Sequence, residues 1–166
     1  MTYTLAEINA LDRAEFVRVV GPVFERSPWI AERAAGERPF ADGSALHAAL
    51  CAVVQRATAE EQLGLVRAHP DLVGRVVLTA ESQGEQAAAG LTNLSPDEAA
   101  LFDRYNREYQ VRFEFPFVIC ARLNKKEAIL AAFPERLQHS AEAERATALA
   151  EIEKIASLRL ADLIRS

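Results

Sequence analysis

Helix-start signals recur along this chain, and they constrain its fold more than any other feature. Each signal places Ser, Thr, Asp or Asn three residues before a Glu, which is the spacing of a helix capping box. The signals occupy residues 12–15, 58–61, 82–85, 95–98 and 124–127. Strand signals are confined to two isolated runs, at residues 72–78 and 115–120, which do not make a stable sheet. The sequence therefore predicts an all-α fold, a compact irregular bundle of about seven or eight helices.

Proline, glycine and serine add further helix boundaries. Ser27 before Pro28 is typical of an N-cap followed by the first helical position. Ser82 is expected to cap the helix that contains Glu85, and Gly90 falls near the end of that helix. These signals predict where helices begin and end, but not how the helices pack.

The length and charge place the chain among ordinary globular proteins. A chain of 166 residues is long enough to bury a real core, and a single domain spanning residues 1–166 is expected. The net charge of −5 leaves no basic excess, so neither nucleic acid nor an anionic membrane is an expected partner. The first residues lack a positive region followed by an apolar run, so no signal peptide is expected and a cytoplasmic location is predicted.

Metal and nucleotide sites are not expected. The three histidines, His47, His69 and His139, form no HExxH motif, and the two cysteines, Cys51 and Cys120, form no CxxC pair. Both cysteines have apolar neighbours and are expected to be buried free thiols. No GxGxxG or P-loop pattern is present to hold phosphates. The sequence thus predicts neither a metal site nor a nucleotide-phosphate site.

His69 and Glu85 form the best acid–base pair that the chain offers. Pro70 cannot continue a helix and restricts the residue before it, so His69 is expected at a helix end beside a loop. An imidazole titrates near neutral pH, which suits proton transfer. Two plainer interpretations stay open. His69 can be a helix C-terminal residue stabilised by the macrodipole, and Glu85 can be the partner of Ser82 in a capping box.

Arg159 falls on the apolar face of the predicted last helix, with Ile152, Ile155, Ala156 and Leu160. A guanidinium on such a face must pair with an anion or extend to water. It is therefore either a snorkelling or salt-bridged arginine, or a clamp for a substrate carboxylate or carbonyl, to which its planar fork is suited.

An apolar segment without a helix signal runs from Phe115 to Arg122, and Asn124 is expected to begin the next helix. Pro116 ends the preceding helix. An extended segment inside an α-helical domain leaves backbone N–H and C=O groups without helical partners. Either the protein itself satisfies these groups, or the segment offers them to a planar, amide-rich ligand.

Four segments stand in a fixed order along the chain. They are Ala68-His-Pro-Asp-Leu72, then Leu78-Thr-Ala-Glu-Ser82 with Glu85-Gln86 and Ala89-Gly-Leu91, then Phe115-Pro-Phe-Val-Ile-Cys-Ala-Arg122, and last Leu158-Arg-Leu-Ala-Asp-Leu163. Each motif alone is modest, but four in this order are specific. Together they resemble the OHCU decarboxylases, which act on 2-oxo-4-hydroxy-4-carboxy-5-ureidoimidazoline in the urate-to-allantoin pathway.

The resemblance implies an all-helical homodimer that binds this small ureidoimidazoline and uses no cofactor. It implies decarboxylation to (S)-allantoin by acid–base catalysis with stereospecific protonation. Catalytic roles are implied for His69, Glu85 and Arg159. Substrate contacts are implied for Ser82, Gln86 and Pro70, and for the backbone of Phe117, Val118 and Ile119.

One segment departs from the family's pattern, and two other functions compete with it. The connection at residues 74–78 is about one helical turn shorter than in the family, which is expected to alter the rim of the pocket. The first competitor is a non-catalytic helical binding module, which would show a broad exposed apolar patch and no pocket joining the three catalytic side chains. The second is a metal-dependent hydrolase, which the small number of histidines disfavours.

Overall fold

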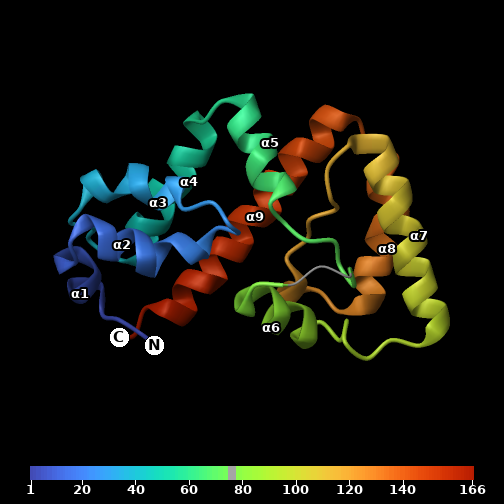
Figure 1. The fold of residues 1–166 in the computed structure, drawn as a ribbon, viewed down its shortest axis with the longest axis horizontal. Helices are drawn as coiled ribbons and strands as arrows, with labels where there is room; N and C mark the ends of the chain where they lie inside the picture. Colours follow the sequence, from blue (N-terminus) through green and yellow to red (C-terminus); the bar gives the residue numbers. More distant parts are fainter. Residues whose placement is uncertain (75–77) are drawn as a thin grey trace. The chain divides into compact units, whose positions relative to one another are not determined.

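The computed structural model describes residues 1–74 and 78–166, and Figure 1 shows their fold. Over these residues the chain forms nine α-helices, three short 3-10 helices and no strand, which confirms the predicted all-α class. The α-helices are α1 (Leu5–Ala10), α2 (Arg13–Val20), α3 (Trp29–Ala34), α4 (Gly43–Arg56), α5 (Ala59–Arg67), α6 (Ala80–Ala88), α7 (Pro96–Phe113), α8 (Lys126–Arg136) and α9 (Ala141–Leu163). The 3-10 helices are η1 (Gly21–Val23), η2 (Ala35–Glu37) and η3 (Ala121–Leu123).

The described residues divide into two compact units. The first unit comprises Met1–Ala68 and Glu153–Ser166, so it contains α1 to α5 and the second half of α9. Within it α3 packs against α2 and α4. The core side chains of this unit are fully buried, and they include Ile8, Phe16, Ile30, Leu46, Leu50 and Leu65. The two chain ends meet here, because Tyr3 N–H donates to Leu163 C=O at 2.9 Å (Figure 1).

The second unit, His69–Ile152, contains α6, α7, α8, η3 and the first half of α9. Residues 116–120 belong to no helix, and Figure 1 shows them as a long trace between α7 and η3. Aromatic rings bury this segment. Phe117 stacks on Phe133 of α8 with centroids 3.9 Å apart, and Tyr109 of α7 meets Phe117 edge-on at 5.3 Å. The predicted non-helical segment is therefore present in the core of this unit.

Several helix starts agree with the sequence analysis, and two caps do not. The confirmed caps accept a hydrogen bond from the N–H three residues on, and they are Asp12, Thr58 and Ser95. Ser27 instead donates its hydroxyl to Glu25 C=O at 2.9 Å, and α3 has no side-chain cap. Asn124 donates its amide to Cys120 C=O at 2.9 Å, and α8 likewise has no side-chain cap. In both cases a turn uses the side chain that the helix was expected to use.

Three further points complete the comparison with the sequence. α1 begins with a capping box of Thr4 and Glu7, which the sequence analysis did not single out. The β-branched run at residues 72–78 and the shortened connection at residues 74–78 fall partly on residues 75–77, which lie outside the described residues. Of the helices described, none is both long and apolar enough to cross a membrane.

Candidate active site

One face of α6 carries three of the predicted site residues. The helix begins earlier than expected, because Thr79 is its N-cap and accepts a hydrogen bond from Ser82 N–H at 3.2 Å. The predicted capping box of Ser82 and Glu85 is therefore wrong, and both residues lie inside the helix. Positions 82, 85 and 86 are neighbours at helical spacing. Ser82 and Gln86 are buried and Glu85 is half-buried, whereas Gln83 is exposed.

His69 begins the loop that follows α5, as the sequence predicts. The helix ends at Arg67, and Ala68 is its C-cap. His69 is buried, with 8% of its surface exposed, and Pro70 after it is half-buried. The expected position of the imidazole, at a helix end beside a loop, is therefore confirmed.

Side chains from α7 and α6 hold the loop after His69. Asn106 of α7 donates its amide to Leu72 C=O at 2.7 Å, and Gln86 of α6 accepts from Val73 N–H through Oε1 at 3.1 Å. Val73 has a φ of 60°, a left-handed conformation that β-branched residues rarely adopt. Gln86 therefore has a structural task besides the predicted substrate contact. Its Nε2 has no hydrogen-bond partner among the residues that the structure describes.

The non-helical segment between α7 and η3 is anchored through alternate residues. Val118 C=O accepts a hydrogen bond from Arg136 Nη1 at 2.7 Å. Cys120 N–H donates to Glu151 Oε1 at 3.1 Å. The backbone groups of the two residues that flank Val118 have no hydrogen-bond partner within the described part of the chain. The protein thus satisfies some backbone groups of this segment, and others have no hydrogen-bond partner among the described residues.

α6 also lies close to the end of this segment. It packs against η3, which directly follows Cys120. Burial raises the pKa of the Cys120 thiol, and the carboxylates of Glu151 and Glu85 raise it further. Glu85 is therefore near enough for its charge to act on Cys120. Within the second unit, α6 contacts both the loop that follows His69 and the end of the non-helical segment.

Arg159 belongs to the first unit and is buried, with 6% of its surface exposed. Its Nη2 lies 3.0 Å from Glu25 Oε2, and its Nη1 donates to Pro22 C=O at 3.1 Å. The Glu25 side chain is itself fully buried. A snorkelling Arg159 is therefore excluded, and the expected salt bridge is confirmed. The sequence analysis missed Glu25, which directly follows the apolar residues Val23 and Phe24.

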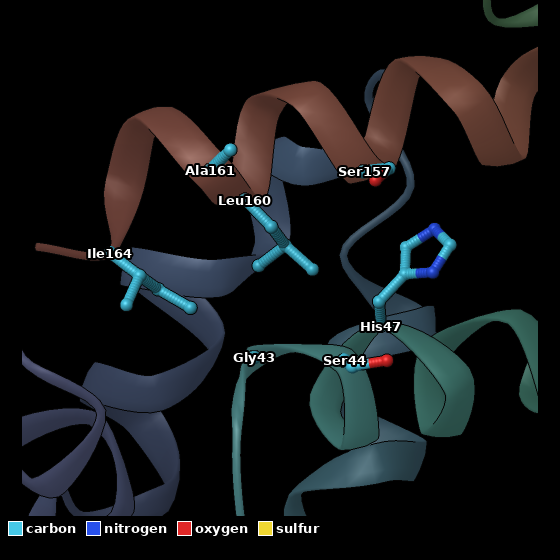
Figure 2. A pocket seen from close by; sticks show the side chains of 7 residues that line it. All are labelled: Gly43, Ser44, His47, Ser157, Leu160, Ala161 and Ile164. Atoms are coloured by element: carbon cyan, nitrogen blue, oxygen red, sulfur yellow. The ribbon is translucent and has the colours of Figure 1, made fainter. Parts of the chain in front are cut away.

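A cavity of about 450 Å³ opens in the first unit between the start of α4 and the end of α9 (Figure 2). None of the predicted site residues lines this cavity. The lining residues are Gly43, Ser44, His47, Ser157, Leu160, Ala161 and Ile164. His47 Nε2 lies 2.9 Å from Glu153 C=O and 3.4 Å from Cys51 Sγ, so the imidazole already has partners within the protein. Within the described residues, no group of three or more His, Cys, Asp or Glu side chains is placed to hold a metal ion.

The sequence of the chain is similar to those of named decarboxylases. A family model described as OHCU decarboxylase matches residues 9–161. Two of the curated relatives are named 2-oxo-4-hydroxy-4-carboxy-5-ureidoimidazoline decarboxylase. The relative from Haloferax volcanii is 44% identical over 163 residues, which cover 98% of this chain and 97% of the relative. The relative from Amia calva is 45% identical over 165 residues, which cover 97% of this chain and 94% of the relative.

Solved structures share the fold. The crystal structure of (S)-allantoin synthase matches with a TM-score of 0.81 at 29% identity over 98% of this chain, which spans 54% of that longer chain. The crystal structure of OHCU decarboxylase in the presence of (S)-allantoin matches in fold with a TM-score of 0.67 at 24% identity, over 80% of this chain and 88% of that chain. Because the family model matches most of the residues and both relatives align nearly end to end, the chain belongs to the OHCU decarboxylase family.

Proposed function

We propose that this protein decarboxylates 2-oxo-4-hydroxy-4-carboxy-5-ureidoimidazoline to (S)-allantoin in urate degradation, without a cofactor. Membership of the family supplies the reaction. The structural observation that carries the proposal is the contact of α6 with two other segments of the second unit. Gln86 of α6 binds the loop that follows His69, and α6 packs against η3 at the end of the non-helical segment.

The substrate itself provides the electron sink for decarboxylation. The bond to the carboxylate breaks beside a ring C=N bond, so the electron pair left by CO₂ forms a ring C=C bond while the imine nitrogen takes up a proton. The resulting enol becomes a carbonyl by losing its hydroxyl proton, and the ring carbon that bears the ureido group gains a proton. The protein must orient the carboxylate, assist these proton transfers and protonate that carbon from one face.

His69 is the proposed proton-transfer group. Glu85 would orient and charge-stabilise the imidazole, or accept the proton of the substrate hydroxyl. The burial of His69 supports this role, because a site that excludes water limits proton leakage to solvent. General acid–base assistance of this kind contributes about 10²–10⁴ in rate.

The proposed substrate-binding groups are Ser82, Gln86, Pro70 and the backbone of residues 117–119. Gln86 is well suited to this task, because the bond from Val73 N–H fixes its Oε1 and so orients Nε2 as a donor. Ser82 lies one turn before Gln86 on the same face of α6. The backbone groups that flank Val118 supply N–H and C=O partners for an amide-rich ring. These donors and acceptors match the ring amide and ureido groups of the substrate.

Arg159 is proposed to anchor a polar group of the substrate. Support comes from family membership and from the way its guanidinium is held. Glu25 and Pro22 fix the plane of the fork through Nη2 and Nη1. A fixed planar fork suits recognition of a carboxylate or carbonyl, and lysine could not replace it.

A chiral assay tests the reaction directly. Freshly prepared substrate is mixed with the protein, and circular dichroism is followed at the allantoin bands. The spontaneous reaction also reaches allantoin but without facial control, so we expect an optically active product at an accelerated rate. A racemic product at the uncatalysed rate would reject the proposal and favour the helical binding module.

Alanine variants test the two proton-transfer residues. His69→Ala and Glu85→Ala should each lower kcat by about 10²–10⁴, because each removes a general acid–base group or its orienting partner. The far-ultraviolet dichroism should stay that of the wild type. Gln83→Ala is the matched control, since Gln83 is exposed on the same helix as Glu85. Near-normal turnover in either of the first two variants contradicts its assignment.

The competing binding module has little support on the described surface. It predicts a broad exposed apolar patch. Among the described residues, the exposed large hydrophobic side chains are Met1, Val111 and Leu123, which are widely separated in sequence. Exposed apolar residues that occur singly are normal on a globular protein.

We further propose that the protein acts in the cytoplasm as a homodimer. The family resemblance supports the dimer, and the buried free thiols of Cys51 and Cys120 fit a reducing compartment. Size-exclusion chromatography with light scattering should give twice the chain mass of 18.3 kDa. A mass equal to that of one chain, at concentrations where the enzyme is active, contradicts the dimer.

A further inference from the structure

A buried arginine of α8 holds the backbone of the non-helical segment. Arg136 is 6% exposed, and its Nη1 donates to Val118 C=O at 2.7 Å. Its Nε donates to Glu144 Oε1 at 2.8 Å, and the guanidinium carbon lies 4.1 Å from the centroid of the Phe117 ring. One planar group therefore contacts a carboxylate, a carbonyl and an aromatic face, and the fixed plane of its donors is a property that an ammonium lacks.

Glu144 fixes the orientation of this arginine. Its side chain is fully buried, and Oε1 also accepts a hydrogen bond from Tyr109 O–H at 2.5 Å. The other oxygen, Oε2, lies 2.9 Å from His139 Nδ1. Burial raises the pKa of the Tyr109 hydroxyl, and its bond to Glu144 raises it further, so Tyr109 stays a neutral donor. The carboxylate is thus surrounded by donors and binds Arg136 in one geometry.

The anchored carbonyl determines which backbone groups face away from α8 and α9. In extended backbone the N–H and C=O groups of successive residues point to opposite sides. Arg136 binds Val118 and Glu151 binds Cys120, so these two residues direct their polar groups to the same side. The groups of Phe117 and Ile119 then point to the other side, where they have no hydrogen-bond partner among the described residues.

This arrangement is not one that stability alone requires. A buried ion pair can often be replaced by apolar side chains without loss of stability. Here Arg136 Nη2 is buried with no hydrogen-bond partner in the described part of the chain, which is an added cost. A task other than stability therefore accounts better for the buried pair of Arg136 and Glu144.

We propose that Arg136, held by Glu144, is a positioning residue for the substrate. It fixes the backbone at Val118 so that the N–H and C=O groups of Phe117 and Ile119 face a planar ligand rich in amide groups. This inference rests on the proposed function, because it deepens the substrate contact assigned to this backbone. Arg136 itself does not touch the substrate.

The variant Arg136→Lys tests the proposal most directly. A lysine keeps the charge that Glu144 needs but cannot bind Glu144 and Val118 C=O together through one planar fork. We expect KM to rise about tenfold, the worth of one ligand hydrogen bond, while kcat changes by less than about twofold. His69→Ala should show the opposite pattern, in which kcat falls and KM changes little. A folded Arg136→Lys enzyme with wild-type KM overturns the proposal.

Two further variants separate positioning from folding. Lys126→Met removes an ion pair with Glu98 from the same helix but leaves Val118 untouched, so its KM should equal that of the wild type. The double variant Arg136→Met with Glu144→Gln removes both buried charges at similar volume, and it should fold and show the raised KM. A wild-type KM in the folded double variant also overturns the proposal.

Hydrogen exchange separates this inference from the proposed function. Peptides spanning residues 115–121 should exchange about tenfold faster in Arg136→Lys than in the wild type, because the backbone loses one anchor. If the wild-type protein fails the chiral assay, the proposed function falls and the exchange experiment still decides the anchoring. Unchanged exchange overturns the anchoring, whether or not the enzyme is active.

Discussion

At the scale of single residues, Gln86 shows how one side chain serves both structure and site. The sequence motif predicts a substrate contact for Gln86, and the structure assigns its Oε1 to Val73 N–H. Val73 occupies a left-handed conformation that is costly for a β-branched residue and persists only where the surroundings impose it. The bonds from Asn106 to Leu72 and from Val73 to Gln86 are those surroundings. No sequence pattern reveals them, because they join residues far apart in the chain.

The buried thiol of Cys51 is expected to make the stability of the fold depend on pH. The sequence predicts a buried free thiol, and the structure confirms it, with 7% of the residue exposed. Burial, together with the smaller effect of the nearby Glu153 charge, raises its pKa from 9.0 to about 12. The raised value means that the folded state keeps this proton at pH values where the unfolded state loses it. Stability is therefore unaffected below about pH 9 and falls between pH 9 and 12.

The prediction concerns the free energy of unfolding at alkaline pH. Between pH 9 and 11 the Cys51 thiol should remove up to about 1.4 kcal/mol of stability per pH unit. Urea denaturation at pH 8 and pH 10 measures the loss in the wild type and in Cys51→Ala. The alanine variant should lose less stability over this interval, because it lacks the Cys51 thiol. Cys120 and all other titrating groups are the same in both proteins. Equal losses in the two proteins would show that Cys51 does not titrate as described.

At the scale of helices, the sequence predicts a start correctly where the residue with the cap signal bonds the first turn of its helix. Thr58 and Ser95 are such cases, and their capping boxes form as expected. The start of α6 was predicted wrongly, because Thr79, three residues before the expected cap Ser82, is the N-cap of the helix. A start at Thr79 places Ser82 inside the helix, where it is buried on one face with Gln86. Burial of that face is a tertiary effect, which local signals do not contain.

A pair of variants distinguishes the cap of α6 from its site residue. Thr79→Ala removes the acceptor of the Ser82 N–H bond and should cost about 1 kcal/mol of helix stability. Amide exchange in the first turn of α6 should therefore become faster in Thr79→Ala. Ser82→Ala should leave that exchange unchanged and raise KM instead. Faster first-turn exchange in Ser82→Ala, with none in Thr79→Ala, would restore Ser82 as the cap.

The side chains that bond the backbone of the non-helical segment could not be predicted from the sequence. The sequence indicates that residues 115–122 leave backbone groups to be satisfied, and this is correct. It does not indicate that Arg136 and Glu151 satisfy them. Glu144 is one of several glutamates in a helix rich in Ala and Glu, and nothing in that pattern separates it from Glu142. Only the packing of α7, α8 and α9 within the second unit selects it.

At the scale of the whole molecule, α9 is the element that belongs to both units. Its first half, up to Ile152, lies in the second unit, and its second half, from Glu153, lies in the first. The sequence analysis expects a single domain over residues 1–166, which stays a prediction. A continuous helix with each half packed in a different core gives that prediction a physical reason, because unfolding of either core removes part of the packing of α9.

The two buried thiols make the single-domain prediction testable. Cys51 lies in the first unit and Cys120 in the second, so each reports the opening of its own core. In increasing urea, pulse labelling followed by mass spectrometry should show both thiols becoming reactive at one midpoint, as in a two-state transition. Ala150→Gly, at an exposed position of α9 in the second unit, should cost about 1 kcal/mol. If the units unfold together, this variant lowers both midpoints equally. If only the Cys120 midpoint moves, the units unfold independently and the single-domain prediction is wrong.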